Sequence, residues 1–164
     1  MIRPLGADDA PAYGEFCRAL DREDLRLRLG RYVVVEDSCI RRMLAGEGDE
    51  VVLAEHGPEG EIVGVSRLVL AAEPEIAVIV RPGWKRRGIG AALVEALVAT
   101  ARARRLPMLH AYVLAENVAM LALARRLGFR AVQAAGTMVT LELPLGAAAA
   151  RAGDAALQSG GATR

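Results

Sequence analysis

The stretch RPGWKRRGIGAALVEALV, residues 81–98, decides how this sequence folds. It follows the apolar run EIAVIV at 75–80, which is typical of a buried strand. It leads into a segment, 88–104, whose apolar residues recur at helical spacing, at Ile89, Leu93, Leu97 and Ala101. Pro107 then prevents this helix from continuing. The stretch therefore predicts a strand, a loop rich in glycine and positive charge, and a long amphipathic helix.

The start of this helix has the composition of an anion-binding site. Gly88 and Gly90 let the backbone approach a ligand closely, and the N–H groups and positive dipole end of a helix favour an anion. Lys85, Arg86 and Arg87 add positive charge beside them. This chemistry predicts a bound diphosphate. The alternative interpretation is a glycine pair that only eases the start of the helix, beside solvated basic side chains.

Two familiar phosphate-binding motifs do not fit this loop. A dinucleotide fold requires GxGxxG directly after a strand, but seven residues separate Val80 from Gly88, and Leu93 occupies the position of the third glycine. A Walker loop requires GxxxxGK[ST]. Gly83 and Gly88 have that spacing, yet Ile89 and Gly90 follow in place of Lys and Ser or Thr. Both interpretations are rejected.

The rest of the chain predicts a mixed α/β domain. Strands are expected at 1–5, 51–55, 62–71, 75–80 and 108–114, with a further pair within 129–143 around Gly136. Helices are expected from Pro11 to Leu20 and at 21–29, 38–44, 88–104 and 117–127. Residues 50–81 form an antiparallel meander, and a strand–helix–strand crossover follows. We expect one domain over 1–144, with a mixed, mostly antiparallel sheet flanked by helices, and an Ala/Gly-rich flexible tail over 145–164.

Composition narrows the class of protein. The formal net charge of +1 argues against bulk attraction to nucleic acid or to an anionic membrane. No apolar stretch approaches the ~20 residues needed to cross a bilayer, and the first residues lack the apolar core of a secretory signal. Cys17 and Cys39 lack CxxC spacing, so a metal site and a disulfide framework are not expected. These features favour a cytoplasmic protein with neither membrane nor nucleic acid as a partner.

Two separate blocks of the sequence resemble the GNAT superfamily of N-acyltransferases. In RPGWKRRGIGAALVEALV, Gly88 and Gly90 match the glycines of the family's acetyl-CoA loop, and Lys85 stands where Arg or Gln is usual. The second block, VLAENVAMLALARRLGF, runs from Asn117 to a helix-ending Gly128-Phe129. The start, IRPLGADDAPAYGEF followed by DREDLRLRLG, is similar to the bacterial protein lysine acetyltransferase branch. The resemblance implies a GNAT-like domain in which a splayed strand pair holds acyl-CoA.

The same resemblance implies how acetyl-CoA, the co-substrate, would bind. The backbone of Val78, Ile79 and Val80 would pair with the pantetheine arm like an extra strand. A backbone N–H beside this strand would face the oxyanion of the tetrahedral intermediate. The cofactor-binding loop would comprise Lys85, Arg86, Arg87, Gly88, Ile89, Gly90 and Ala91, with the amides from Arg86 to Ala91 on the diphosphate. Asn117 would contact acetyl-CoA, and it is also among the best residues for capping a helix.

Acyl transfer to an amine requires a neutral nitrogen, whereas a lysine amine with a pKa of ~10.4 is almost wholly protonated at neutral pH. Glu75, at the start of the strand at 75–80, matches the position of the general base in the lysine acetyltransferase branch. It would act directly or through a water. The alternative is a solvent-facing carboxylate at a strand end, which is our interpretation of Glu73. Glu116 would orient the substrate or face water.

One position departs from the family pattern. Many members carry a tyrosine seven residues after the asparagine, where it protonates the leaving thiolate, but this chain has Ala124. A thiolate with a pKa near ~8.5 is a tolerable leaving group, so this loss need not abolish turnover. The other candidates are assigned to structure: Tyr112 and Cys17 to the core, His56 and His110 to satisfied structural positions.

The leading hypothesis is therefore an enzyme that acetylates a protein lysine, for example on an acyl-CoA synthetase. A small amine is the alternative acceptor, and a non-catalytic acyl-CoA sensor is a third hypothesis, made plausible by Ala124. The first helices, around Phe16, Arg26 and Arg28, are expected to shape the acceptor pocket, and their basic character argues against polycations. The basic clusters at 85–87 and 102–105 lack interleaved aromatic residues, which argues against nucleic acid. The protein is expected to be a monomer or homodimer.

Overall fold

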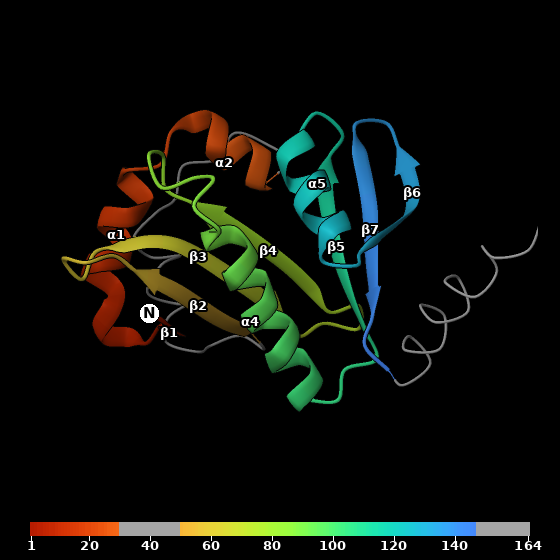
Figure 1. Cartoon of the computed structure of the whole chain (residues 1–164), viewed down its shortest axis with the longest axis horizontal. Coiled ribbons are helices and arrows are strands. Elements are labelled where there is room, and N and C mark those ends of the chain that lie inside the picture. The colour runs from red at the N-terminus through yellow and green to blue at the C-terminus, as the bar shows by residue number, and fades with distance from the viewer. Residues whose placement is uncertain (30–49, 147–164) are drawn as a thin grey trace, which may run out of the picture.

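The computed structural model describes residues 1–29 and 50–146 of the chain (Figure 1). The helix expected at 38–44 and residues 147–164 of the expected tail lie outside the described residues. None of the described helices is both long and apolar enough to span a bilayer.

Seven strands form one sheet in the order β1-β2-β3-β4-β5-β7-β6. The strands are β1 (Ile2–Pro4), β2 (Glu50–His56), β3 (Ile62–Val69), β4 (Glu75–Val80), β5 (Met108–Leu114), β6 (Arg130–Ala135) and β7 (Met138–Pro144). The described helices are a short 3-10 turn, η1 (Ala7–Asp9), and α1 (Ala10–Arg18), α2 (Arg22–Leu29), α4 (Ile89–Ala103) and α5 (Val118–Arg126).

The pairing of the strands confirms the predicted class. Strands β1 to β4 are successive antiparallel neighbours, β4 and β5 are parallel, and β7 pairs antiparallel with both β5 and β6. The parallel pair requires a crossover, and α4 supplies it, as the 88–104 pattern predicts. Strands β4 and β5 have the predicted bounds, whereas β3 ends at Val69 rather than at 71 and α1 ends at Arg18 rather than at 20.

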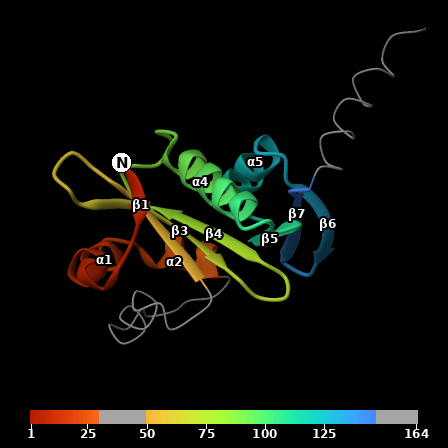
Figure 2. The same ribbon diagram turned by 90° about the horizontal axis from the view of Figure 1, so that it is seen from below.

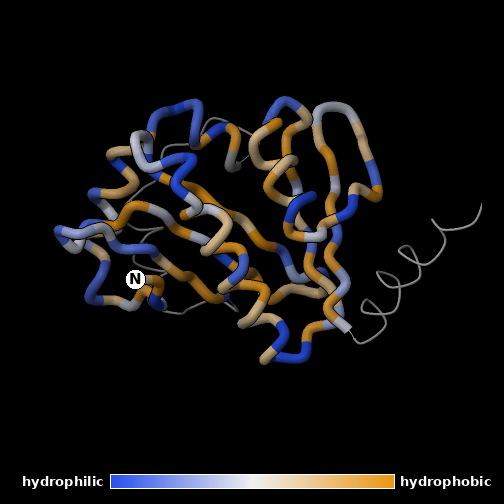
Figure 3. The backbone as a smooth tube through the Cα atoms, viewed as in Figure 1, coloured by the Kyte–Doolittle hydropathy of each residue, from blue (hydrophilic) through white to orange (hydrophobic). Residues whose placement is uncertain are grey.

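The helices cover both faces of the sheet. Figure 2 shows α4 and α5 on one face and α1 and α2 on the other. The larger core lies under α4, where Leu93 and Leu97 are fully buried against strand residues such as Leu68 and Leu109. In Figure 3 the central strands and α4 carry many of the hydrophobic, orange stretches of the tube. A smaller core under α1 contains Phe16, together with Val52, Ala54, Ile62 and Val65.

Gly64 of β3 explains how closely α4 packs on the sheet. A Cβ at this position would lie 2.8 Å from Cγ2 of Ile89 and 2.9 Å from Cδ1 of Leu93. Both distances are shorter than real contacts, so only glycine lets the first two turns of α4 rest on β3. This packing positions the start of α4 beside the carboxyl end of β4.

Candidate active site

Strands β4 and β5 pair at a single register position, Glu75 with His110. There the His110 N–H donates to the carbonyl of Pro74 at 2.8 Å. Beyond this position the two strands diverge toward their carboxyl ends, as Figure 1 shows. The sheet is therefore open between β4 and β5, which is the splay that the family resemblance implies.

Strand geometry determines which backbone groups of β4 face this opening. The N–H of Arg81, just after β4, donates to the carbonyl of Val63 at 2.9 Å, so Arg81 points its backbone groups toward β3. Successive residues of a strand point their N–H and C=O groups to opposite sides. Val78 and Val80 therefore point theirs toward β5, into the opening, where an extended ligand could pair with them.

A cavity of about 670 Å³ occupies the opening. Ten of the twelve site residues predicted from the sequence line it: Glu75, Val78, Ile79, Val80, Lys85, Arg86, Gly88, Gly90, Ala91 and Asn117. The other two do not. The Arg87 guanidinium lies 4.7 Å from the centre of the Trp84 ring, and Ile89 packs against the larger core. Their backbone N–H groups still belong to the loop and helix start that border the cavity.

The start of α4 presents backbone N–H groups at one end of the cavity. Gly88 is the N-cap with φ +83°, and Arg86 also has a positive φ of 61°. The N–H of Ala92 donates to the Gly88 carbonyl at 3.0 Å, which is the first bond of the helix ladder. Helix geometry therefore leaves the N–H groups of Ile89, Gly90 and Ala91 without an acceptor inside the helix. Such groups, beside basic side chains, suit a phosphate.

The side chain of Asn117 caps α5, because its Oδ1 accepts from the Met120 N–H at 3.1 Å. The capping role considered from the sequence is thus confirmed, and Asn117 also lines the cavity, so its carboxamide nitrogen can serve a ligand. Its neighbour Glu116 accepts a hydrogen bond from Arg26 at 2.5 Å. The substrate-orienting role considered for Glu116 is untested.

Two expectations about the first helices are wrong. Phe16 does not shape an acceptor pocket, because it is only 2% exposed within the smaller core. Arg26 does not give the cavity a basic character, because its guanidinium is paired with Glu23 and Glu116, which raise its pKa. Helix α2 instead contributes the carboxylate of Asp24 and the side chain of Leu27 to the cavity wall. The side chain of Arg28 lies outside the described residues.

Tyr112 is not a core residue, contrary to the sequence-based assignment. It is 39% exposed, lines the cavity and donates its hydroxyl to Oε2 of Glu73 at 3.1 Å. Partial burial and this hydrogen bond raise the pKa of Tyr112 above its ordinary value. The phenol therefore stays neutral at physiological pH. Glu73 is exposed, as expected, but its carboxylate accepts a hydrogen bond from Tyr112 instead of facing solvent alone.

The remaining candidates lie outside the cavity. His110 was expected to be satisfied, yet among residues 1–29 and 50–146 its buried Nδ1 has no hydrogen-bond partner, and its Nε2 lies 3.6 Å from Oε1 of Glu142. Cys17 packs at the edge of the smaller core, as expected, whereas His56 is the last residue of β2, one residue beyond the strand expected at 51–55. Ala124 is 1% exposed in the larger core, so the position where the family's tyrosine is usual supplies no polar group.

Comparison with protein families identifies one that matches most of this domain. The sequence pattern described as "Acetyltransferase (GNAT) family" matches residues 16–129, from within α1 through the loop and α4 to Phe129, just before β6. The match thus includes both strands of the splay, the glycine loop and Asn117.

Solved structures resemble the whole described fold. The GNAT domain of S. lividans PAT superposes with a TM-score of 0.81 at 25% identity, over 88% of this chain and 89% of that one. A ribosomal-protein-alanine N-acetyltransferase from Brucella melitensis gives 0.74 at 22% identity, over 88% and 99%. A phosphinothricin acetyltransferase from Sinorhizobium meliloti, solved in complex with AcCoA, gives 0.73 at 17% identity, over 89% and 88%. The last two likenesses establish the fold alone.

Proposed function

Because this chain belongs to the acetyltransferase (GNAT) family and is thus an acetyl-CoA-dependent N-acetyltransferase, we propose that it acetylates the side-chain amine of a protein lysine, with Glu75 as general base. We further propose a cytoplasmic monomer or homodimer. The observation that carries the proposal is the placement of Glu75 at the closed end of the cavity, opposite the start of α4.

The length of β4 suits an acyl-CoA that lies along it. Val80 lies five residue steps after Glu75, and at ~3.3 Å a step the two are roughly 16 Å apart. A diphosphate held by the N–H groups of Ile89 to Ala91 would direct the pantetheine arm past Val80 and Val78. The thioester would then lie toward the closed end, within reach of an amine that approaches Glu75.

The reaction requires one proton to leave the acceptor before attack. The carboxylate of Glu75 takes that proton from the ammonium, directly or through a water, and the neutral nitrogen attacks the thioester carbon. The carbonyl oxygen becomes an oxyanion, which the backbone N–H of Val78 stabilises in this proposal. The C–S bond then breaks, the nitrogen loses its second proton to solvent, and CoA leaves as a thiolate. Because Ala124 offers no acid, the thiolate is protonated by water after it leaves.

The acceptor assignment rests on the resemblance of the sequence to the lysine acetyltransferase branch. One observation favours a second candidate, a small polycationic amine. The basic character that argued against polycations is absent at Arg26, whose charge is paired with Glu23 and Glu116.

A panel of acceptors separates these possibilities. The protein would be incubated with acetyl-CoA alone, then with a folded acyl-CoA synthetase, lysine peptides, polyamines or amino acids. Free CoA and acetylated product would be quantified by mass spectrometry, because thiol reagents would also react with Cys17 and Cys39. We expect acceptor-dependent CoA release with the protein substrate. Release only with polyamines would favour the second candidate, and acetyl-CoA binding without any release would favour a sensor.

A further inference from the structure

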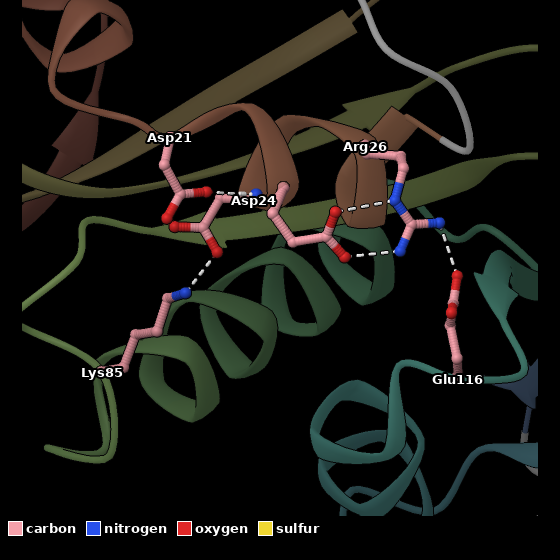
Figure 4. A network of polar contacts seen from close by, with 6 residues as sticks. Asp21, Asp24, Arg26, Lys85 and Glu116 are labelled. Atoms are coloured by element: carbon pink, nitrogen blue, oxygen red, sulfur yellow. Dashed lines mark hydrogen bonds and ion pairs between the residues drawn. The ribbon is translucent and has the colours of Figure 1, made fainter.

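Helix α2 connects the two loops that border the cofactor end of the cavity. Its Asp24 forms an ion pair with Lys85 of the β4–α4 loop, and its Arg26 forms one with Glu116 of the β5–α5 loop. The partners of these pairs are 61 and 90 residues apart in sequence. Figure 4 shows both contacts along one side of α2. The helix thus lies across β4 and β5 and forms one ion pair with the loop that follows each of these strands.

The two ion pairs differ in how many partners the charged group of α2 has. Arg26 binds both oxygens of Glu23, at 2.8 and 2.5 Å, and also Glu116. Asp24 is only 8% exposed, and within the described residues its Oδ2 has no hydrogen-bond partner. Lys85 is the one cation with which Asp24 forms an ion pair in the described part of the chain. The buried carboxylate therefore depends on the position of a single lysine side chain.

Lys85 is also one of the cations of the loop that precedes the start of α4. Its side chain is 49% exposed, and an ammonium on a four-carbon stem turns easily from one partner to another. A diphosphate bound at the N–H groups of Ile89 to Ala91 would bring more negative charge to Lys85 than Asp24 offers. The single positive charge of Lys85 cannot neutralise both the Asp24 carboxylate and the diphosphate.

We propose that Asp24 is a positioning residue that competes with the diphosphate of acetyl-CoA for Lys85, so that cofactor binding releases α2 from the β4–α4 loop. This inference rests on the proposed acetyl-CoA site. Release leaves Asp24 buried without a cation, and that arrangement is unfavourable. Helix α2 must then shift, and because Asp24 and Leu27 line the cavity, the shift changes the cavity wall. Cofactor binding and the state of α2 are therefore coupled in both directions.

The test is a thermodynamic cycle on acetyl-CoA binding, measured by calorimetry and by the fluorescence of Trp84, the only tryptophan in the chain. We expect Asp24→Asn to bind acetyl-CoA about 5- to 10-fold more tightly than the unmodified protein at low salt. The affinity for S-acetylpantetheine, which has no diphosphate, should not change. In a Lys85→Gln background the effect of Asp24→Asn should disappear, because there is no ammonium to compete for.

Asp21→Asn is the matched control. It removes one negative charge from the start of the same helix, and asparagine can still accept the hydrogen bond that Asp21 Oδ1 receives from the Asp24 N–H at 2.6 Å. Two results would show a long-range charge effect and overturn the inference. One is an increase in acetyl-CoA affinity of similar size in Asp21→Asn. The other is an increase caused by Asp24→Asn that persists in the Lys85→Gln background. Unchanged affinity in Asp24→Asn would overturn it too. Failure of the unmodified protein to bind acetyl-CoA would instead overturn the proposed function, and this inference with it.

Discussion

The side chain of Asn117 accepts a hydrogen bond from the backbone N–H of Met120 at 3.1 Å, and the same side chain lines the cavity between β4 and β5. One carboxamide therefore has two separable functions. Its oxygen completes the first turn of α5, and its NH₂ group is available to a ligand.

Two substitutions at this position should separate the two functions. Asn117→Ala removes both and should lower the free energy of unfolding by ~1 kcal/mol, the usual value of an N-cap. Asn117→Ser keeps a capping oxygen and should retain most of that stability. Both variants should weaken acetyl-CoA binding by roughly fivefold, the value of one hydrogen bond. Denaturant unfolding and calorimetry measure the two effects, and full affinity in Asn117→Ser would limit Asn117 to capping.

Gly88 is expected to be required for acetyl-CoA binding as well as for an unstrained backbone at its positive φ. Its φ of +83° equals that of Gly60 in the β2–β3 turn, and an added Cβ meets nothing within 4 Å at either position. Alanine at each should therefore cost a similar ~1 kcal/mol of stability. Only Gly88→Ala should weaken acetyl-CoA binding, by about tenfold or more, because its methyl group and altered backbone disturb the phosphate-facing N–H groups. Equal affinities in Gly88→Ala and Gly60→Ala would contradict the diphosphate assignment.

Tyr112 should titrate above its ordinary pKa of ~10. Burial favours its neutral form first, and its hydrogen bond to Glu73 adds to the effect. Glu73→Gln should lower the pKa of Tyr112 but not restore it fully, because burial remains. Carbon NMR of labelled tyrosine follows the titration, and Tyr112→Phe identifies the resonance. A pKa of Tyr112 that does not respond to Glu73→Gln would mean that the hydrogen bond is not formed in solution.

Asp9 should make part of the stability dependent on pH. Arg3 binds its carboxylate at 2.6 and 2.8 Å, and together with the Gly6 N–H lowers its pKa to about 2. A carboxyl group with a lowered folded-state pKa stabilises the protein above its unfolded pKa of ~3.9, and this contribution is lost as the pH falls toward 2. Asp9→Asn should therefore cost up to about 1 kcal/mol at pH 7, and less at pH 3. Urea unfolding at both values tests this, and an equal cost at both would contradict it.

The sequence predicts those parts of the fold in which local signals agree. Strand β4, strand β5 and helix α4 are bounded by glycine, proline and a change of apolar period, so their ends are predictable to within a residue. The glycine loop identifies the phosphate end of the cavity because Gly88 and Gly90 directly precede an amphipathic helix.

The rest of the site depends on contacts that a local pattern cannot contain. Tyr112 was misassigned because alternation in β5 shows that its side chains face two sides, but not that one side borders the opening beside β4. The pairs Lys85–Asp24 and Arg26–Glu116 join segments far apart in sequence. Asp24 offered only a weak signal, an acidic residue between arginines on a short helix.

The most direct test of the central claim is the rate of acceptor-dependent CoA release by Glu75→Gln as a function of pH. Exposed Glu95 of α4 supplies the matched control, Glu95→Gln, which should match the unmodified protein. We expect Glu75→Gln to lower kcat/KM by about 10²- to 10⁴-fold at pH 7, and the deficit to shrink as the pH approaches the amine pKa of ~10.4, because free amine then forms without a base. An unchanged kcat/KM at pH 7, or a deficit that does not vary with pH, would contradict the assignment of Glu75 as the general base.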